Sequence, residues 1–273
     1  MMINKKWRIL TIGDGDLSFS KALLIHQPAS LTATVYDSLA TMSGKYGDLF
    51  YQQLKLENIP ILFEFDVCNP TSWMGLEKNS FDLVIFQFPL LPAFRSFSEY
   101  KQCADKLNIN TLNRRLLRDF LINSFSYFID PNGQQLCFIT SKDVKPYRQW
   151  NIENALHLNT DINYLGSMPF DIKMFPGYKI RNVDRDKHVK DTKGVTYVWS
   201  RLKRHSIIDK LNPAQFLGDN YCTACRAGPF TTELDSMQHN KSIKHKQMME
   251  LERLWLADLD NSGSKVALKN DQK

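Results

Sequence analysis

The strongest constraint on the fold of this 273-residue chain is the alternation of short apolar runs with helical periodicity over residues 1–202. This alternation predicts an α/β domain with a mainly parallel β-sheet and crossover helices. The run at Phe81–Phe86 is almost entirely apolar, which favours a central strand buried on both faces. We expect strands at Arg8–Ile12, Leu31–Tyr36, Ile61–Phe65, Phe81–Phe86, Gln135–Thr140, Ile162–Leu165 and Val195–Leu202, and helices at Ser20–His26, Met42–Leu56, Asp105–Phe128 and Trp150–Leu158.

A second, smaller unit follows this domain. Residues 203–218 have the composition of a linker, and residues 219–260 combine a Cys/His motif with a helical extension. Residues 261–273 are polar and are expected to be disordered. The length suits one full domain plus a small module, because domains commonly have about 100–200 residues.

Charge and composition limit the binding partners and the cellular compartment that we expect for the protein. The net charge of +6 weakly favours a polyanionic partner such as RNA. No apolar stretch is long enough for a membrane span, and the N-terminus lacks a signal-peptide pattern. The five cysteines are scattered and odd in number, which is typical of a reducing compartment. We therefore expect an intracellular protein without a membrane partner, and a monomer.

The Cys/His motif has the spacing of a zinc site. Cys222, Cys225, His239 and His245 stand in the pattern C-x2-C-x13-H-x5-H. Two thiolates on a tight turn and two imidazoles on one helix can close a tetrahedral structural Zn²⁺ site. The five residues between the histidines and the basic segment HNKSIKHKQ, which contains both of them, resemble RNA-associated, matrin-type C2H2 zinc fingers, although a module that binds protein is an alternative.

The first expected strand ends in a glycine-containing loop. Gly13 and Gly15 permit close approach of a ligand to the backbone, but Ser18 stands where a dinucleotide fingerprint needs a third glycine. Asp14 and Asp16 would repel a pyrophosphate, whereas the sulfonium and ammonium groups of S-adenosylmethionine would attract them. This loop favours a methyltransferase over an NAD-dependent dehydrogenase.

Two further acids follow the next strands. Asp37 ends the second expected strand and is placed to accept hydrogen bonds from ribose hydroxyls. Asp66 ends the third and is placed to accept one from the adenine amine. Because the carboxyl ends of parallel strands share one edge, we expect a common crevice, although each acid could instead cap a helix.

The fourth strand ends in Gln87, Phe88 and Pro89. In amino-directed methyltransferases an amide or acid at this position orients the target nitrogen, and the following aromatic ring stacks on a flipped base. We therefore regard these three residues as candidate catalytic residues. The alternative is a strand that simply ends at proline with a buried Phe.

Several segments together resemble a known family, the large-subunit rRNA (uridine-N3) methyltransferase-like family. The resemblance covers roughly residues 7–200 and lies in GDGDLSFS (Gly13–Ser20), TVYDS (Thr34–Ser38) with the KYG after it, FDLVIFQFP (Phe81–Pro89), PYRQWNIENA (Pro146–Ala155) and FPGYKIR (Phe175–Arg181). It implies a class I Rossmann-like fold, S-adenosylmethionine as cofactor and an RNA base as substrate. It also implies contacts to the methionine end of the cofactor from Gly13, Asp14, Gly15, Asp16 and Ser18, with Asp37 on the ribose and Asp66 on the adenine.

The chain departs from this family at the fourth strand. The family usually has Asn-Phe-Pro-His there, and this chain has Gln87, Phe88, Pro89 and Leu90. We expect an S-adenosylmethionine-dependent methyltransferase of rRNA uridine N3, with a zinc finger that assists RNA binding. A catalytically decayed fold that binds RNA is one alternative, and a dehydrogenase is another. The resemblance implies that the protein is located in the nucleus or nucleolus if the cell is eukaryotic, and in the cytoplasm otherwise.

Overall fold

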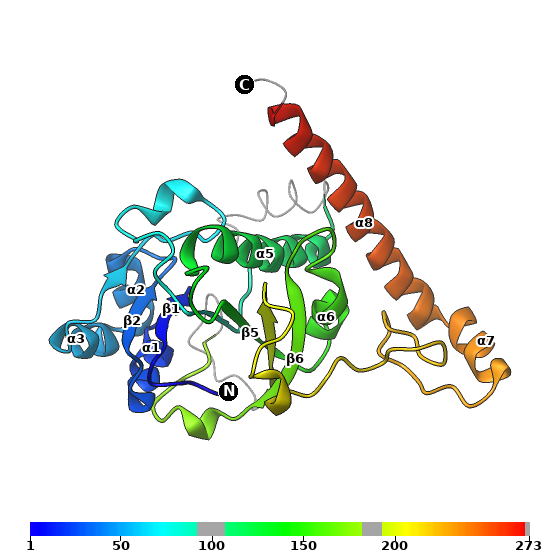
Figure 1. Cartoon of the computed structure of the whole chain (residues 1–273), viewed down its shortest axis with the longest axis horizontal. Helices are drawn as coiled ribbons and strands as arrows, with labels where there is room; N and C mark the ends of the chain where they lie inside the picture. Colours follow the sequence, from blue (N-terminus) through cyan, green and yellow to red (C-terminus); the bar gives the residue numbers. More distant parts are fainter. Residues whose placement is uncertain (92–106, 182–192, 271–273) are drawn as a thin grey trace.

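A computed structural model describes residues 1–91, 107–181 and 193–270, and only the backbone of residues 262–270. Its centre is a seven-stranded sheet in the order β3-β2-β1-β4-β5-β7-β6 (Figure 1). The strands are β1 (Arg8–Ile12), β2 (Ser30–Thr34), β3 (Ile61–Leu62), β4 (Leu83–Gln87), β5 (Leu136–Lys142), β6 (Asn163–Phe170) and β7 (Gly194–Ser200).

The described α-helices are α1 (Ser18–Leu23), α2 (Leu39–Tyr46), α3 (Leu49–Leu56), α5 (Ile109–Asn123), α6 (Ile152–Ala155), α7 (Glu233–Lys241) and α8 (Ile243–Asn270). Shorter helical turns are η1 (Leu24–His26), η2 (Pro70–Trp73), η3 (Ser124–Phe128), η4 (Tyr147–Trp150), η5 (Ile172–Met174) and η6 (Ile208–Lys210). None of the helices in the described part of the chain is long and apolar enough to cross a membrane.

The strand directions confirm the predicted Rossmann-like sheet. β1, β2, β3, β4 and β5 run parallel, and β7 is antiparallel to both of its neighbours, β5 and β6. The sheet order reverses between β1 and β4, because β2 lies on one side of β1 and β4 on the other. Such a switch point leaves a crevice beyond the carboxyl ends of the strands, where ligands bind in open α/β sheets.

The central strands are apolar because both faces of the sheet are covered. Successive residues point to opposite faces, so Leu83 and Ile85 pack with Phe19 of α1 in one core cluster. Val84 and Phe86 pack in a second cluster, which includes Leu117, Phe120 and Leu121 of α5. The fourth predicted strand is therefore central and buried, as its composition indicated.

The helix expected at Met42–Leu56 is two helices in the structure. Gly47 has a φ of +79° and ends α2, and Asp48 then precedes α3. Helical periodicity continues across the break, so the apolar pattern alone did not reveal it. Glycine accepts this left-handed conformation at low cost, which is why the chain turns here.

Other boundaries also differ from the expected ones. Asn108 caps α5 by accepting from the Asn110 N–H at 2.8 Å, so the helix begins four residues later than expected; residues 105 and 106 lie outside the described part. The third strand is only Ile61–Leu62, and β6 extends to Phe170 rather than ending at Leu165. Residues 182–192, which precede β7, lie outside the described part of the chain.

The segment expected to be a linker, residues 203–218, is partly packed on the domain. Ile207 is buried in the cluster that contains Phe19, and Asn212 exchanges two backbone hydrogen bonds with Ser167 at 2.7 and 2.9 Å. Gly166 allows this approach, because a Cβ there would lie 2.5 Å from the Asn212 carbonyl oxygen.

The C-terminal region differs most from expectation. The two histidines lie on different helices, His239 on α7 and His245 on α8. Ser242 separates the helices with an extended ψ of 147°, and its Oγ accepts from the His245 N–H at 3.1 Å. The break therefore supplies the hydrogen-bond acceptor that a helix beginning at Ile243 needs. The backbone of α8 continues to Asn270, beyond the expected start of disorder at residue 261, because extending an existing helix adds one hydrogen bond per residue.

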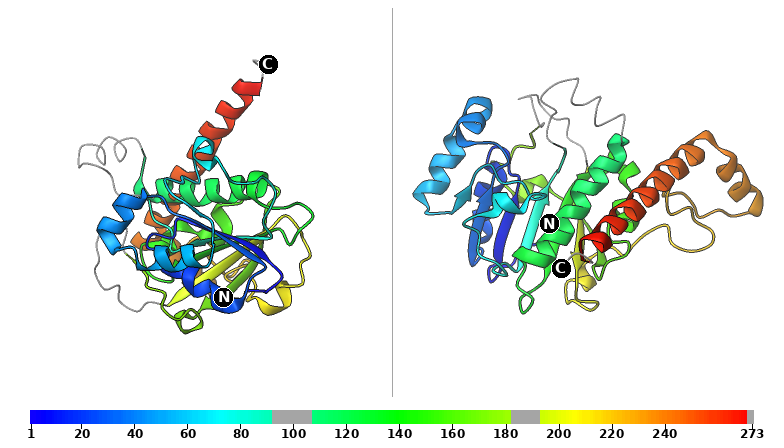
Figure 2. Two further views of the ribbon diagram at one scale, coloured as in Figure 1. Left: turned by 90° about the vertical axis from the view of Figure 1, so that its left-hand side faces the viewer. Right: turned by 90° about the horizontal axis from the view of Figure 1, so that it is seen from above.

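Helix α8 packs along α5 (Figures 1 and 2). Trp255 is 0% exposed and donates its indole N–H to the Ala155 carbonyl oxygen at 2.9 Å. The fully buried Arg114 of α5 holds both carboxylate oxygens of Glu252 at 2.7 and 3.1 Å. A buried indole and a two-point ion pair fasten α8, so the C-terminal unit is docked on the α/β domain.

Candidate functional site

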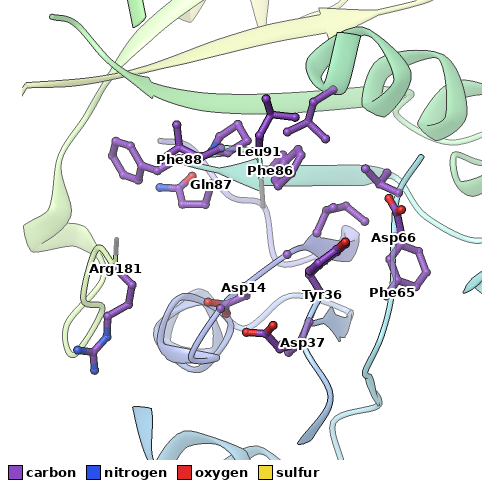
Figure 3. Close-up of a pocket in the computed structure, with 18 of the residues that line it drawn as sticks. Asp14, Tyr36, Asp37, Phe65, Asp66, Phe86, Gln87, Phe88, Leu91 and Arg181 are labelled. Atoms are coloured by element: carbon purple, nitrogen blue, oxygen red, sulfur yellow. The ribbon is translucent and has the colours of Figure 1, made fainter. Parts of the chain in front are cut away.

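A cavity of about 510 Å³ opens at the carboxyl ends of β1, β2 and β4 and beside the loop after β3 (Figure 3). It gathers nearly all the residues that the sequence singled out for the cofactor and the target base. Those that line it are Gly13, Asp14, Gly15, Asp16, Asp37, Asp66, Gln87, Phe88 and Pro89. Ser18 is not among the lining residues.

Gly13 makes the turn out of β1 possible. Its φ is +61°, and a Cβ there would lie 3.1 Å from the ring of Phe86. Its N–H bonds the Thr34 hydroxyl at 3.2 Å, and the Asp14 N–H bonds the Thr34 carbonyl at 2.9 Å. The loop is therefore fastened to β2, and a side chain at position 13 would push it off the strand tip.

The two acids of this loop have different surroundings. Asp16 pairs with Arg181 at 2.6 Å and accepts from the Ser18 N–H at 3.0 Å. Asp14 accepts from the Ser20 N–H at 2.6 Å. Burial, and secondly the charge of Asp16, raise the pKa of Asp14 to about 7. Arg181 thus neutralises Asp16, and a cation bound beside Asp14 would lower the raised pKa of that carboxyl group.

Ser18 lies behind the loop and ties it to a distant segment. It is fully buried, and its hydroxyl accepts from the Lys179 N–H at 3.1 Å. Lys179 and its neighbours Tyr178 and Arg181 form the opposite wall of the cavity. In the structure the Ser18 side chain joins the two walls, and its direct contact with a cofactor remains a prediction.

The acids after β2 and β3 also have polar partners within the protein. Asp37 pairs with Lys45 of α2 at 2.9 Å, and both line the cavity. One carboxylate oxygen of Asp66 accepts from the Cys68 N–H at 2.9 Å. The side chains of Asp14, Asp37 and Asp66 come from three separate strand ends and face the same space (Figure 3).

Gln87 at the tip of β4 has a buried amide. Neither its Oε1 nor its Nε2 has a hydrogen-bond partner among the residues that the structure describes. A buried amide without partners costs about 1–3 kcal/mol, so a ligand that pairs with it would recover this free energy. Phe88 follows with a φ of +48°, and its ring packs edge-on against Phe170 at 5.5 Å.

Other lining residues were given no role from the sequence. Arg181 and Tyr178 lie in the FPGYKIR segment and Tyr46 in the KYG segment, so the family resemblance contained a signal for them. Arg115 and Asp119 lie on α5, in a stretch without a motif, and only the packing of this helix beside the loop after β3 reveals them.

The four predicted metal ligands come together in the C-terminal unit. The candidate ligand atoms of Cys222, Cys225, His239 and His245 all lie within 4.8 Å of one another. Both sulfurs are 3.6 Å from His245 Nδ1, which lies 3.1 Å from His239 Nε2. Tetrahedral zinc with bonds of about 2.3 Å to sulfur and about 2.0 Å to nitrogen would separate these atoms by about 3.5 Å, so the cluster has the size of a zinc site.

A family model decides the assignment of the domain that contains the cavity. Residues 10–182 match the BMT5-like family, described as rRNA (uridine-N3-)-methyltransferase BTM5-like. The chain belongs to the BMT5-like family. It is an S-adenosylmethionine-dependent RNA methyltransferase by this membership, and the alternative of an NAD-dependent dehydrogenase is set aside.

The chain is also similar to a curated rRNA methyltransferase and to solved structures of tRNA methyltransferases. The chain is 23% identical to the 25S rRNA (uridine(2634)-N(3))-methyltransferase of Saccharomyces cerevisiae, over 76% of each chain. The solved structure of the tRNA methyltransferase TrmK from B. subtilis covers 93% of this chain and 94% of its own, at 12% identity and a TM-score of 0.42. TrmN from Thermus thermophilus covers 72% of this chain and 44% of its own, at 14% identity and a TM-score of 0.41.

Proposed function

We propose that this BMT5-like protein methylates N3 of a uridine in large-subunit rRNA. The observation that supports this most is the cavity, in which Gly13, three acids from successive strand ends and the Gln87 amide face one space within the matched residues 10–182. An enzyme that modifies rRNA works where ribosomes are assembled, so we expect a nucleolar or nuclear location in a eukaryotic cell.

The cavity suits S-adenosylmethionine in shape and charge. The close approach at Gly13 and the acid Asp14 would accommodate the methionine end, and Asp37 would accept from the ribose hydroxyls. Phe86 and Val67 offer apolar walls for a planar base, with Asp66 at their edge. When bound, the cofactor supplies an electrophilic methyl group.

Gln87 would hold the target base. Its amide N–H groups can donate to a uracil carbonyl oxygen next to N3, which positions the base and leaves N3 itself open to the methyl group. An amide does not titrate near neutral pH, so Gln87 positions the base and does not take its proton. Leu90, where the family has histidine, cannot take it either, so the N3 proton would pass to solvent water before N3 accepts the methyl group. Most of the rate enhancement would then come from alignment of the base.

A direct assay tests this function. Purified protein is incubated with large-subunit rRNA and S-adenosylmethionine, and the digested RNA is analysed for methylated nucleosides by mass spectrometry. We expect 3-methyluridine, and none with the Asp37→Ala variant. Methylation at another atom would contradict the proposed target, and cofactor binding without any methylation would favour the decayed, RNA-binding alternative.

We also propose that the Cys/His cluster binds one structural Zn²⁺ and that this finger grips RNA near the target. Supporting this, Lys241, Lys244 and Lys246 are exposed beside the cluster, where they can contact phosphates. Elemental analysis of the purified protein should give one zinc per chain. Changing these three lysines to glutamine should weaken RNA binding and flatten its salt dependence; unchanged binding would favour a protein partner.

A further inference from the structure

A second acid lies near Asp66 in the cavity and has no assigned role. Asp119 is on α5, and Leu112 and Leu116 line the cavity from the same side of this helix. The helix is fastened here, because Asn123 donates its amide N–H to the Val67 carbonyl oxygen at 2.8 Å. Positions 112, 116, 119 and 123 follow the spacing of one helix face, so Asp119 faces the loop after β3.

Asp119 has an acceptor capacity that the protein does not use. Asp66 already accepts from the Cys68 N–H, whereas Asp119 makes no hydrogen bond or ion pair within the described ranges 1–91, 107–181 and 193–261. Burial first, and then the charges of Asp119 and Asp66, raise the pKa of the Cys68 thiol to about 12. Both carboxyl groups therefore lie close to Cys68, at the end of the cavity that is lined from β3.

The neighbouring arginines are held by other groups. Arg115 precedes Asp119 by one helical turn, the spacing of a favourable ion pair. Its guanidinium instead binds both carboxylate oxygens of Asp258 on α8, with Nε to Oδ2 at 2.6 Å, and Asp258 is only 4% exposed. Arg118 donates to the carbonyl oxygens of Leu156 and Leu158, each at 2.7 Å.

This arrangement leaves a carboxylate beside apolar walls at the adenine end. Leu116, Phe86 and Val67 provide surfaces for a flat ring, and the ring edge must then meet an acceptor if it carries an amine. We propose that Asp119 accepts a hydrogen bond from the adenine amine of the cofactor, and that Asp258 of α8 keeps it available by holding Arg115. The inference rests on the proposed function, because it presumes that the cavity binds S-adenosylmethionine.

The charge state of Asp119 agrees with this role. Burial raises the pKa of Asp119 to about 6, while Arg115 and Arg118 lower it and Asp258 and Asp66 raise it further. The carboxyl is therefore mostly ionised above neutral pH and can accept the hydrogen bond. A carboxylate that gains a partner on ligand binding also recovers part of its burial cost.

Calorimetry with two ligands tests the first part of the proposal. S-adenosylhomocysteine carries the adenine amine, and S-inosylhomocysteine carries a carbonyl oxygen in its place. The unmodified protein should bind the adenosyl compound more tightly by about 10- to 100-fold, the range expected for a hydrogen bond to a charged group. Asp119→Ala should reduce this preference to a few-fold, and Asp119→Asn should give an intermediate preference.

The exposed Asp209 supplies the control, since Asp209→Asn should change neither affinity. An unchanged preference in both Asp119 variants would overturn the assignment of Asp119. If the unmodified protein binds neither compound, the proposed cofactor site itself fails, which is a different result. Asp119→Asn keeps the size and shape of the side chain, so the test still stands if Asp119→Ala fails to fold.

Two further variants test the role of α8. Asp258→Asn should release Arg115 to pair with Asp119 and weaken S-adenosylhomocysteine binding by about tenfold, because one charged hydrogen bond is then contested. Adding Arg115→Met should restore the affinity, although the pair with α8 stays broken. If affinity falls in Asp258→Asn and Arg115→Met does not restore it, Asp258 acts only on the packing of α8. If Asp258→Asn leaves the affinity unchanged, the proposed role of Asp258 is likewise overturned.

Discussion

The cavity takes its walls from residues between Ile12 and Arg181, whereas the Cys/His cluster takes its four candidate ligands from Cys222 to His245. In the cluster, all four candidate ligands come from one short segment of the chain that includes α7 and the start of α8. In the cavity, a parallel sheet must first place several strand ends at one edge. The two regions meet on α8, which contains His245 in its first turn and carries Asp258 to Arg115 in the cavity wall. The Cys/His cluster, whose ligands are close in the sequence, is thus coupled through α8 to a cavity whose walls come from distant parts of the chain.

Of the changes considered, removal of zinc should have the largest effect, and it should act mainly on the C-terminal unit. Cys222→Ser, or a chelator, should abolish the proposed metal site and unfold α7, because structural zinc contributes about 10–16 kcal/mol to the folding of small fingers. Helical content by circular dichroism and RNA affinity should both fall. S-adenosylhomocysteine affinity should fall only to the level of Asp258→Asn; a complete loss would mean that the finger is part of the active site.

Truncation of the anchor of α8 should have the next largest effect. Trp255→Ala removes a fully buried indole and its bond to Ala155, and should destabilise the protein by about 3–5 kcal/mol. Denaturant unfolding measures this, and the half-exposed Leu256→Ala is the matched control. If Trp255→Ala leaves the free energy of unfolding unchanged, α8 is not docked as described and the two regions are independent.

Loss of the ribose acid should act on the cavity alone. Asp37→Ala should weaken cofactor binding by about 100-fold, since two hydroxyls lose a charged acceptor, and should leave the zinc content unchanged. Its partner provides a comparison, because Lys45→Met removes the ion pair but keeps the carboxylate. Titration calorimetry compares the variants, and equal affinity for Asp37→Ala and the unmodified protein would refute the ribose assignment.

The pH dependence of the cavity should follow Asp14. Its folded-state pKa, about 7, lies above the usual value of 3.8, so the folded protein holds a proton that the unfolded chain releases. Stability from this group is therefore complete below about pH 4 and is lost as the pH rises through about 7. Affinity for the cationic S-adenosylmethionine should rise over the upper part of this range, by at most tenfold per pH unit. Asp14→Asn should flatten both profiles, and persistence of either slope would assign it to another group.

The smallest effect is expected at the tip of β4. Gln87→Asn together with Leu90→His brings back the residues usual in the family, and should keep or raise methyl transfer to uridine without changing cofactor affinity. Single-turnover assays on rRNA measure the transfer step. A marked loss of transfer would show that this chain acts on a different atom, and that the Gln87 amide is matched to it.

Several sequence interpretations rested on local rules. The central strand at Phe81–Phe86 and the parallel order of the sheet followed from apolar composition and alternation, and both are confirmed. The BMT5-like membership confirms the methyltransferase assignment that the acidic loop favoured. The individual roles of Gly13, Asp37, Asp66 and Gln87 stay predictions, although the structure places these residues around one cavity.

The sequence by itself determined the α/β class and the spacing of the Cys/His ligands, because periodicity and short loops act between near neighbours in the chain. Only the tertiary structure decided that Arg181 neutralises Asp16 and that Ser18 lies behind the loop. It also decided that Asp258 holds Arg115 and that Asp119 lines the cavity. Ion pairs and burial depend on contacts between residues more than a hundred positions apart, and no local pattern encodes which partner a charge will meet.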